Sequence, residues 1–205
     1  MSTTSKIDLF KLHKQEYAGR RKPYLVEIGP VKYLAIQGKG APGGTAFQEA
    51  IGRLYAVAYT MKMQSKAAGQ DYVVAKMEAQ WYGEDGDPMF HLKPKEEWCW
   101  KFLIRVPEFI EENHRQEALD AVRAKKKVEG AEAVTLEVHP ASTCVQAMHV
   151  GPYSECGIAI KAMLELAQSQ GYIPRGPHHE IYFSDPRRVP EERLKTLLRY
   201  RIQKP

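Results

Sequence analysis

The two halves of this 205-residue chain show the same order of predicted elements. The segment "YLAIQ", from Tyr33, aligns with "VQAMH", from Val145, and "AIGRL", from Ala50, aligns with "AMLEL", from Ala162, both at a spacing of 112 residues. In each half a strand is followed by a helix and then by two further strands. This duplicated β-α-β-β pattern predicts an α+β fold with pseudo-twofold symmetry, in which an antiparallel sheet carries two long helices on one face.

The two long helices are predicted from apolar residues that recur at steps of three and four. In the first half, from Ala46 to about Ala68, these residues are Phe47, Ile51, Leu54, Tyr55 and Ala58. In the second half, from Cys156 to Gln170, they are Ile160, Met163, Leu164 and Ala167. A third helix is predicted over residues 107–127, where acidic residues come first and the basic run "RAKKK" comes last, as the helix dipole favours. This third helix connects the two halves.

The remaining periodic segments are interpreted as strands. They are residues 31–37, 72–83, 96–107, 135–150 with a break at Pro140, the run "EIYFS" that begins at Glu180, and 196–203. Residues 1–23 are polar and are expected to be an N-terminal extension with little order. The expected organisation is a single domain over residues 24–205, with repeat halves at about 24–130 and 131–205.

Composition narrows the classes of protein to consider. No apolar run is long enough to span a membrane, and the N-terminal residues lack the apolar core of a secretory signal. Three cysteines without a CxxC pair indicate a reduced, cytoplasmic protein. The net charge of +5 is small, and no aromatic residues interleave with the lysines, so we expect neither a nucleic-acid nor a membrane partner. Whether a protein partner exists is left open.

Glu180 stands out because a short aromatic strand rarely begins with a carboxylate. Residues two apart in a strand share a face, so Glu180 and Tyr182 are predicted to point the same way. The tryptophans lie on predicted strands of the first half, at Trp81, Trp98 and Trp100. A carboxylate beside aromatic rings suits a flat apolar or cationic ligand. Two other interpretations stay open: the aromatic residues can be ordinary core, and Glu180 can be a strand-end carboxylate in water or one paired with Arg187 or Arg188.

Several sequence motifs resemble the GyrI-like small-molecule-binding domains. In the second half these are "HVGPY" (149–153), "GYIPRGPHHEIYFSDP" (171–186) and "PEERLKTLLR", and in the first half "EAQWYGED" and "WCWKFLIRVPEFI". The resemblance runs from about Tyr24 to the end of the chain. It implies a ligand groove between the two long helices, with a buried glutamate on the floor of the groove. By motif, that glutamate is Glu180, the tyrosine after "GP" is Tyr153 and the first-half tryptophan is Trp81.

The resemblance is to the stand-alone branch of that family, some of whose members hydrolyse reactive cyclopropane-bearing, DNA-alkylating natural products. The candidate catalytic residues are therefore Glu180 and Tyr153. The candidate ligand-binding residues are Trp81, Trp100, Tyr182, Tyr55 and Met163. A carboxylate beside tryptophans and away from water is expected to have a raised pKa, and so to donate a proton to an electrophile or hold a water for attack.

No cofactor or metal is expected. His178, His179 and Glu180 are consecutive, but neighbours in a strand face opposite ways, and no HExxH or CxxC motif accompanies them. Cys156, at a predicted helix start, is either a thiol with a lowered pKa or buried filler.

The sequence leaves three functions to compare. The first is binding of hydrophobic or cationic planar molecules, the second is hydrolysis of strained-ring electrophiles in the same groove for detoxification, and the third is a non-catalytic protein-interaction module, such as an inhibitor of a DNA-processing enzyme.

Overall fold

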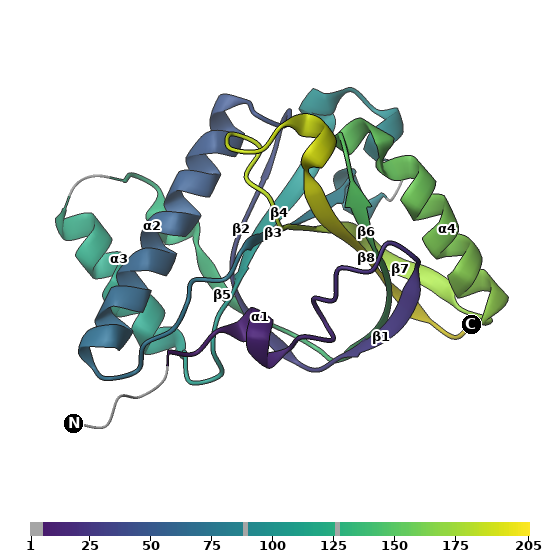
Figure 1. Ribbon diagram of the computed structural model, residues 1–205. Coiled ribbons are helices and arrows are strands. Elements are labelled where there is room, and N and C mark those ends of the chain that lie inside the picture. Colours follow the sequence, from purple (N-terminus) through teal and green to yellow (C-terminus); the bar gives the residue numbers. More distant parts are fainter. Residues whose placement is uncertain (1–5, 88–89, 126–127) are drawn as a thin grey trace.

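The computed structural model describes residues 6–87, 90–125 and 128–205 (Figure 1). The elements of the first half are α1 (Leu9–Leu12), β1 (Tyr24–Ile28), β2 (Val31–Lys39), α2 (Thr45–Ala67), β3 (Met77–Tyr82), β4 (Cys99–Arg105) and α3 (Glu112–Ala124). Those of the second half are β5 (Thr135–His139), β6 (Ser142–Val150), α4 (Cys156–Ser169), β7 (Ile173–Tyr182) and β8 (Lys195–Gln203).

Within the described residues, eight strands form one antiparallel sheet in the order β1-β6-β8-β7-β3-β4-β2-β5. The predicted α+β class with an antiparallel sheet is therefore confirmed. Both halves run strand-helix-strand-strand, and the central pair, β3 and β7, joins them. Each half also lends an edge strand to the other, because β1 pairs with β6 and β5 pairs with β2. Descent of the halves from one duplicated unit, and folding of residues 24–205 as a single unit, stay predictions.

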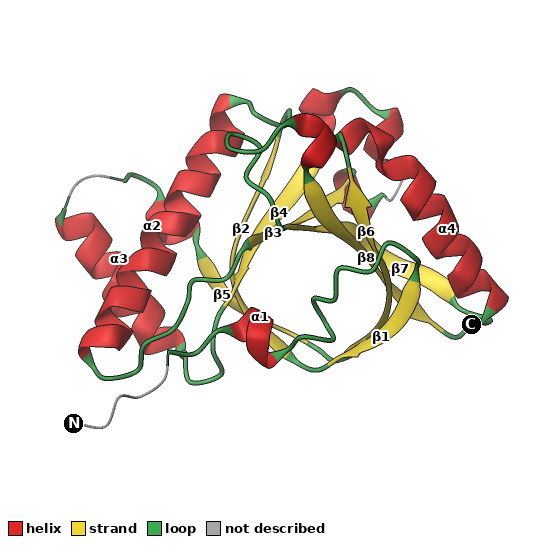
Figure 2. Ribbon diagram, viewed as in Figure 1, coloured by secondary structure: helices red, strands yellow, loops and turns green. Residues whose placement is uncertain are grey.

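The sheet is curved, and its two faces have different coverings. Helices α2 and α4 lie outside the curve, whereas residues 6–23, with α1, run across the inner side (Figure 2). Helix α2 packs on β2 and β4, and α4 packs on β6. None of the helices in the described part of the chain is long and apolar enough to cross a membrane.

A row of paired residues across the helix-covered face shows how this fold is stabilised. Its members are Ile36, Phe102, Ala79, Glu180, Leu198 and Ala147, each the register partner of the next. Glu180 is the one charged member, and the five others are buried apolar residues. Burial of such side chains is the main favourable term in folding. An acidic residue in this row is therefore placed at an energetic cost.

The strand that carries Glu180 differs from the prediction. Strand β7 begins at Ile173, so Glu180 lies inside the strand and not at its start. Its pairing with β8 shifts register between Arg175 and His179, and Gly176 has a φ of 73°. Proline inside a strand is tolerated at such a bulge, and a glycine supplies the left-handed backbone there. The "PRGP" segment therefore forms a bulge in a strand and not the loop that proline and glycine suggested.

Other boundaries also moved. Helix α3 begins at Glu112 and not near Pro107, and the final Lys126 and Lys127 of the predicted helix lie outside the described residues. Strand β1 was not predicted. The alignment of the two halves at a spacing of 112 residues is wrong for the strands. It pairs Ile36 with Met148, but Ile36 packs under α2 and Met148 packs on the inner side of the sheet. A slip of one residue moves a strand side chain to the opposite face.

Residues 6–23 are ordered, contrary to the expectation from their polar composition. Leu9 and Tyr17 are buried, and the Phe10 and Tyr17 rings stack with centroids 3.9 Å apart. The phenol of Tyr17 donates a hydrogen bond to Glu78, which is fully buried on the inner side of the sheet. This segment thus covers polar groups that the sheet alone would leave exposed.

The Gly38→Ala variant is expected to be destabilised by about 1–3 kcal/mol, the usual range for overpacking. A Cβ at Gly38 would lie 2.3 Å from the Trp100 ring, which is buried and stacked on Phe102 and so has little freedom to move. Urea unfolding would measure the change. Gly52→Ala, in α2, is the matched control because its Cβ meets nothing within 4 Å. An unchanged free energy of unfolding for Gly38→Ala would contradict the packing described here.

Candidate functional site

Glu180 lies at the centre of a buried polar cluster on the helix-covered face. Glu180 is only 8% exposed. One carboxylate oxygen, Oε2, accepts hydrogen bonds from the phenol of Tyr182 at 2.7 Å and from the indole Nε1 of Trp81 at 3.2 Å. The other, Oε1, lies 3.0 Å from Nε2 of His178. Both oxygens therefore have partners within the protein.

The alternation of side chains along β7 and the pairing of β7 with β3 bring these groups together. His178, Glu180 and Tyr182 are spaced two apart and share one face, as predicted for Glu180 and Tyr182. Trp81 is the register partner of His178 across the two strands. The pairing of Glu180 with Arg187 or Arg188 that sequence left open is not found among the described residues, because Glu180 pairs with His178 and Arg187 binds Asp185 at 3.0 Å.

The predicted raised pKa of Glu180 is wrong. Burial acts to raise it, but the hydrogen bond and charge of His178, and the hydrogen bonds from Tyr182 and Trp81, outweigh burial and hold the pKa of Glu180 below its ordinary value of 4.5. The carboxylate is thus ionised at neutral pH. It is suited to balancing a cation or to accepting a proton, and not to donating one.

Aromatic rings surround this carboxylate on the first-half side. Phe47 of α2 stacks on Trp81 with ring centroids 5.9 Å apart, and Trp98 meets Trp81 edge-on at the same separation. Trp100 is the register partner of Trp81. At 2% exposure, Trp100 is a buried support for this aromatic floor.

The other residues predicted for the site occupy three different environments. The ring of Tyr153 lies 5.9 Å from that of Tyr182, and Tyr153 is 38% exposed, so it stands at the edge of the cluster. Tyr55 is partly buried on α2 and stacks on Tyr59 at 6.0 Å. Met163, on α4, is fully buried in a cluster with Leu198 and Ala147, the two residues that follow Glu180 in the sheet row.

Sequence reasoning missed three residues near Glu180. His178 could have been found from its spacing of two, whereas Tyr200 and Cys156 need the strand register and the docking of α4. Burial and the charge of Glu180 raise the pKa of the Cys156 thiol and of the Tyr200 phenol, each to about 12. Burial, and to a smaller extent the charge of Glu180, also raises the pKa of Tyr153 to about 12. Cys156 is thus a protonated, buried thiol, and Tyr153 keeps its proton at neutral pH.

Within the described residues, no group of three or more histidine, cysteine or acidic side chains is arranged to hold a metal ion. His178 faces Glu180, while His179 lies on the other face of the sheet, 2.8 Å from Glu78.

An antiparallel sheet that carries an ionised carboxylate on an aromatic floor, beneath two helices, has the features of a small-molecule-binding domain. Residues 21–203 match the GyrI-like small molecule binding domain, and the chain belongs to that family. Among curated proteins, none matches this chain significantly.

Solved structures agree with this assignment. An uncharacterized conserved protein and a hydrolase, both from Listeria innocua, are each 36% identical to this chain and superpose on it with a TM-score of 0.89. Each match covers 97% of this chain and 100% of the other chain. A further hydrolase from Listeria innocua is 34% identical, with the same coverage and a TM-score of 0.86. The C-terminal domain of EcmrR shares the fold at 14% identity and a TM-score of 0.59, over 89% of this chain and 98% of that domain.

Proposed function

We propose that this chain binds planar hydrophobic molecules, and prefers cationic ones, in a groove between α2 and α4 whose floor holds Glu180, Trp81 and Tyr182. The observation that carries this proposal is the single ionised carboxylate set in a row of buried apolar residues. A buried charge needs partners to offset its lost hydration, and here His178, Tyr182 and Trp81 are all committed to supporting Glu180. Binding of a ligand is a reason to keep a carboxylate at this position in an otherwise apolar row.

The chemistry of the floor fits a flat cation. Aromatic faces attract cations, and the attraction grows when water is excluded. The hydrogen bonds from Tyr182 and Trp81 hold the carboxylate in place before a ligand arrives, which lowers the ordering cost of binding. His178 supplies a partner for Glu180 in the absence of a ligand.

The second candidate function is hydrolysis of an electrophilic cyclopropane at the same floor. It is supported by the relatives at 34–36% identity that are described as hydrolases. In this proposal a water forms a carbon–oxygen bond at the ring carbon and gives its proton to Glu180. The strained carbon–carbon bond breaks, its electron pair moves into the conjugated carbonyl, and the Tyr153 phenol protonates the oxygen. The ionised state of Glu180 at neutral pH is the form that a base in this scheme requires.

Binding of a planar aromatic cation is expected to change tryptophan fluorescence through Trp81, whose indole is bonded to Glu180. A screen of such cations would compare the parent protein with Trp81→Phe. The emission change should shrink strongly in the variant. A verified ligand that changes emission equally in both proteins would place the site elsewhere. If no small molecule binds at all, the alternative of a protein-interaction module is favoured.

A further inference from the structure

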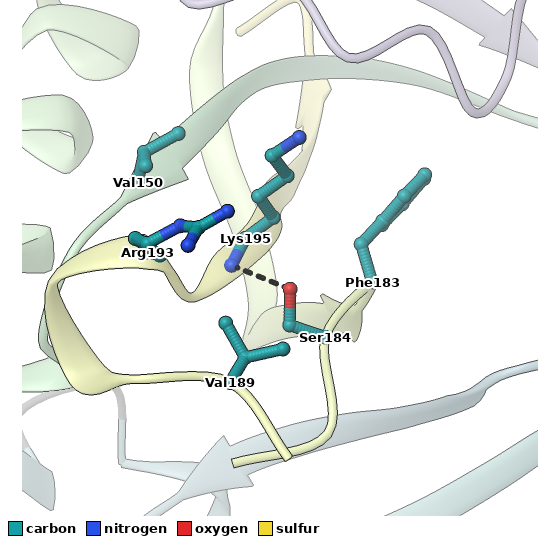
Figure 3. Close-up of a pocket in the computed structure, with 6 residues that line it drawn as sticks. All are labelled: Val150, Phe183, Ser184, Val189, Arg193 and Lys195. Atoms are coloured by element: carbon teal, nitrogen blue, oxygen red, sulfur yellow. Dashed lines mark hydrogen bonds between the residues drawn. The ribbon is translucent and has the colours of Figure 1, made fainter.

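A hollow lies on the opposite face of the sheet from Glu180. It is open, has a volume of about 500 Å³, and is lined by Val150, Phe183, Ser184, Val189, Arg193 and Lys195 (Figure 3). Val150 ends β6, Lys195 begins β8, and the others belong to the segment between β7 and β8. Val150 and Phe183 pack with Tyr17 and Ile181, on the inner side of the sheet. The hollow thus shares no lining residue with the proposed groove.

The walls of this hollow are fixed by hydrogen bonds between the segments that form it. The hydroxyl of Ser184 accepts from the backbone N–H of Lys195 at 3.1 Å (Figure 3). The N–H of Phe183 donates to the carbonyl of Lys195 at 3.0 Å, and that of Gly151 donates to the carbonyl of Leu194 at 3.0 Å. A volume of this size is in the usual range for small-molecule sites, and fixed walls reduce the ordering cost of binding.

The lining combines apolar surface with positive charge. In the part of the chain that the structure describes, neither Arg193 nor Lys195 has an ion-pair partner, and no acidic residue lines the hollow. The side chain of Lys76 adds a third positive charge beside it, because its Nζ donates to the carbonyl of Phe183 at 2.8 Å and lies 5.6 Å from the centre of that ring. The nearby carboxylate of Asp185 is occupied by Arg187.

We propose that this hollow is a binding site for small organic anions with an apolar body, of the arylalkyl carboxylate class. The carboxylate lies between Arg193 and Lys195, and the apolar body covers Val150, Val189 and the ring of Phe183. The guanidinium of Arg193 matches the two oxygens of a carboxylate, and Lys195 contributes a point charge. The ligand charge is the reverse of that proposed for the Glu180 floor, so the two sites take different compounds and the second site is independent of the first.

The test is a titration with 4-phenylbutyrate of protein carrying ¹³C-methyl valine. The methyl signals of Val150 and Val189 are expected to shift and saturate, and the affinity to fall as salt is raised because the cations are exposed. The uncharged 4-phenylbutanamide should bind much more weakly. Arg193→Gln combined with Lys195→Gln should weaken binding of 4-phenylbutyrate about tenfold.

Two control variants separate this site from other effects. Arg188→Gln removes an exposed cation outside the lining and should leave the affinity for 4-phenylbutyrate unchanged. Glu180→Gln should also leave it unchanged, since Glu180 lies on the other face of the sheet. The proposal is overturned if the two valine signals do not move, if the amide binds as well as the acid, or if the double variant binds like the parent. It is likewise overturned if inorganic phosphate binds as tightly as 4-phenylbutyrate, because the apolar wall would then contribute nothing.

Discussion

In the proposed hydrolysis of an electrophilic cyclopropane, Glu180→Gln is expected to lower turnover by about 10²–10⁴-fold, the usual loss when a positioned acid or base is removed. Glutamine has the same shape as glutamate, so the fold should persist. The amide cannot accept a proton from water at neutral pH, which is the step assigned to Glu180. Product analysis under single-turnover conditions would measure the loss. Glu191→Gln, at an exposed carboxylate outside the site, is the control.

The pH dependence of that turnover in the parent protein gives a second test of the role of Glu180. Because the pKa of Glu180 is depressed, the carboxylate stays ionised down to a pH below its ordinary pKa of 4.5. Turnover that needs the ionised form should therefore persist at mildly acidic pH and fall only as pH drops through the folded pKa. Turnover that increased as pH fell below neutrality would instead assign Glu180 the role of proton donor, contrary to this account.

Glu78→Gln is expected to destabilise the protein by about 3–5 kcal/mol, the typical cost of removing one partner from a buried charge network. Glu78 is fully buried on the inner face of the sheet. Its carboxylate accepts hydrogen bonds from Tyr17 at 3.2 Å and Tyr33 at 3.1 Å, and lies 2.8 Å from Nε2 of His179. Losing its charge removes the electrostatic stabilisation that Glu78 gives to the buried Arg199.

Chemical denaturation at several pH values would test this prediction. Burial acts to raise the pKa of Glu78, but His179 and Arg199 outweigh it and lower the pKa. A depressed folded pKa means that the stabilisation is present above the unfolded value of about 4.5 and is lost as pH falls through the folded pKa. Glu78→Gln should therefore remove part of the loss of stability in acid. Glu27→Gln, on the exposed edge of β1, is the control. A change below about 1 kcal/mol for Glu78→Gln would contradict the network.

The face of each strand residue could be predicted wherever the period of two was enough. Glu180 and Tyr182 were placed together correctly for that reason, and the α+β class followed from the order of helical and strand patterns. The environment of Glu180 could not be predicted in the same way. Its lowered pKa depends on His178 and on Trp81, a residue 99 positions away, and that contact exists only because β3 and β7 are paired in one register.

Polar composition was misleading for residues 6–23. Their hydrophilic groups suggested exposure, yet Tyr17 and Glu16 contact buried polar residues on the inner side of the sheet. Glu16, for example, lies 2.5 Å from Nη1 of Arg105. Sequence shows that such residues are polar, but it does not show that the inner side of the sheet supplies their partners. The one-residue slip in the repeat alignment has a similar origin, because a low-identity match does not distinguish the two faces of a strand.

The central claim is that the ionised carboxylate of Glu180 contacts the positively charged group of a planar ligand and balances its charge. The most direct test is calorimetric titration of the parent protein and Glu180→Gln with a planar aromatic cation and with its neutral isostere of the same shape. A hydrogen bond or contact to a charged group is worth on the order of 1.5–3 kcal/mol, so the cation should lose roughly ten- to a hundredfold in affinity while the neutral isostere loses little. Equal affinities of the two proteins for the cation, or equal losses for both ligands, would contradict the claim.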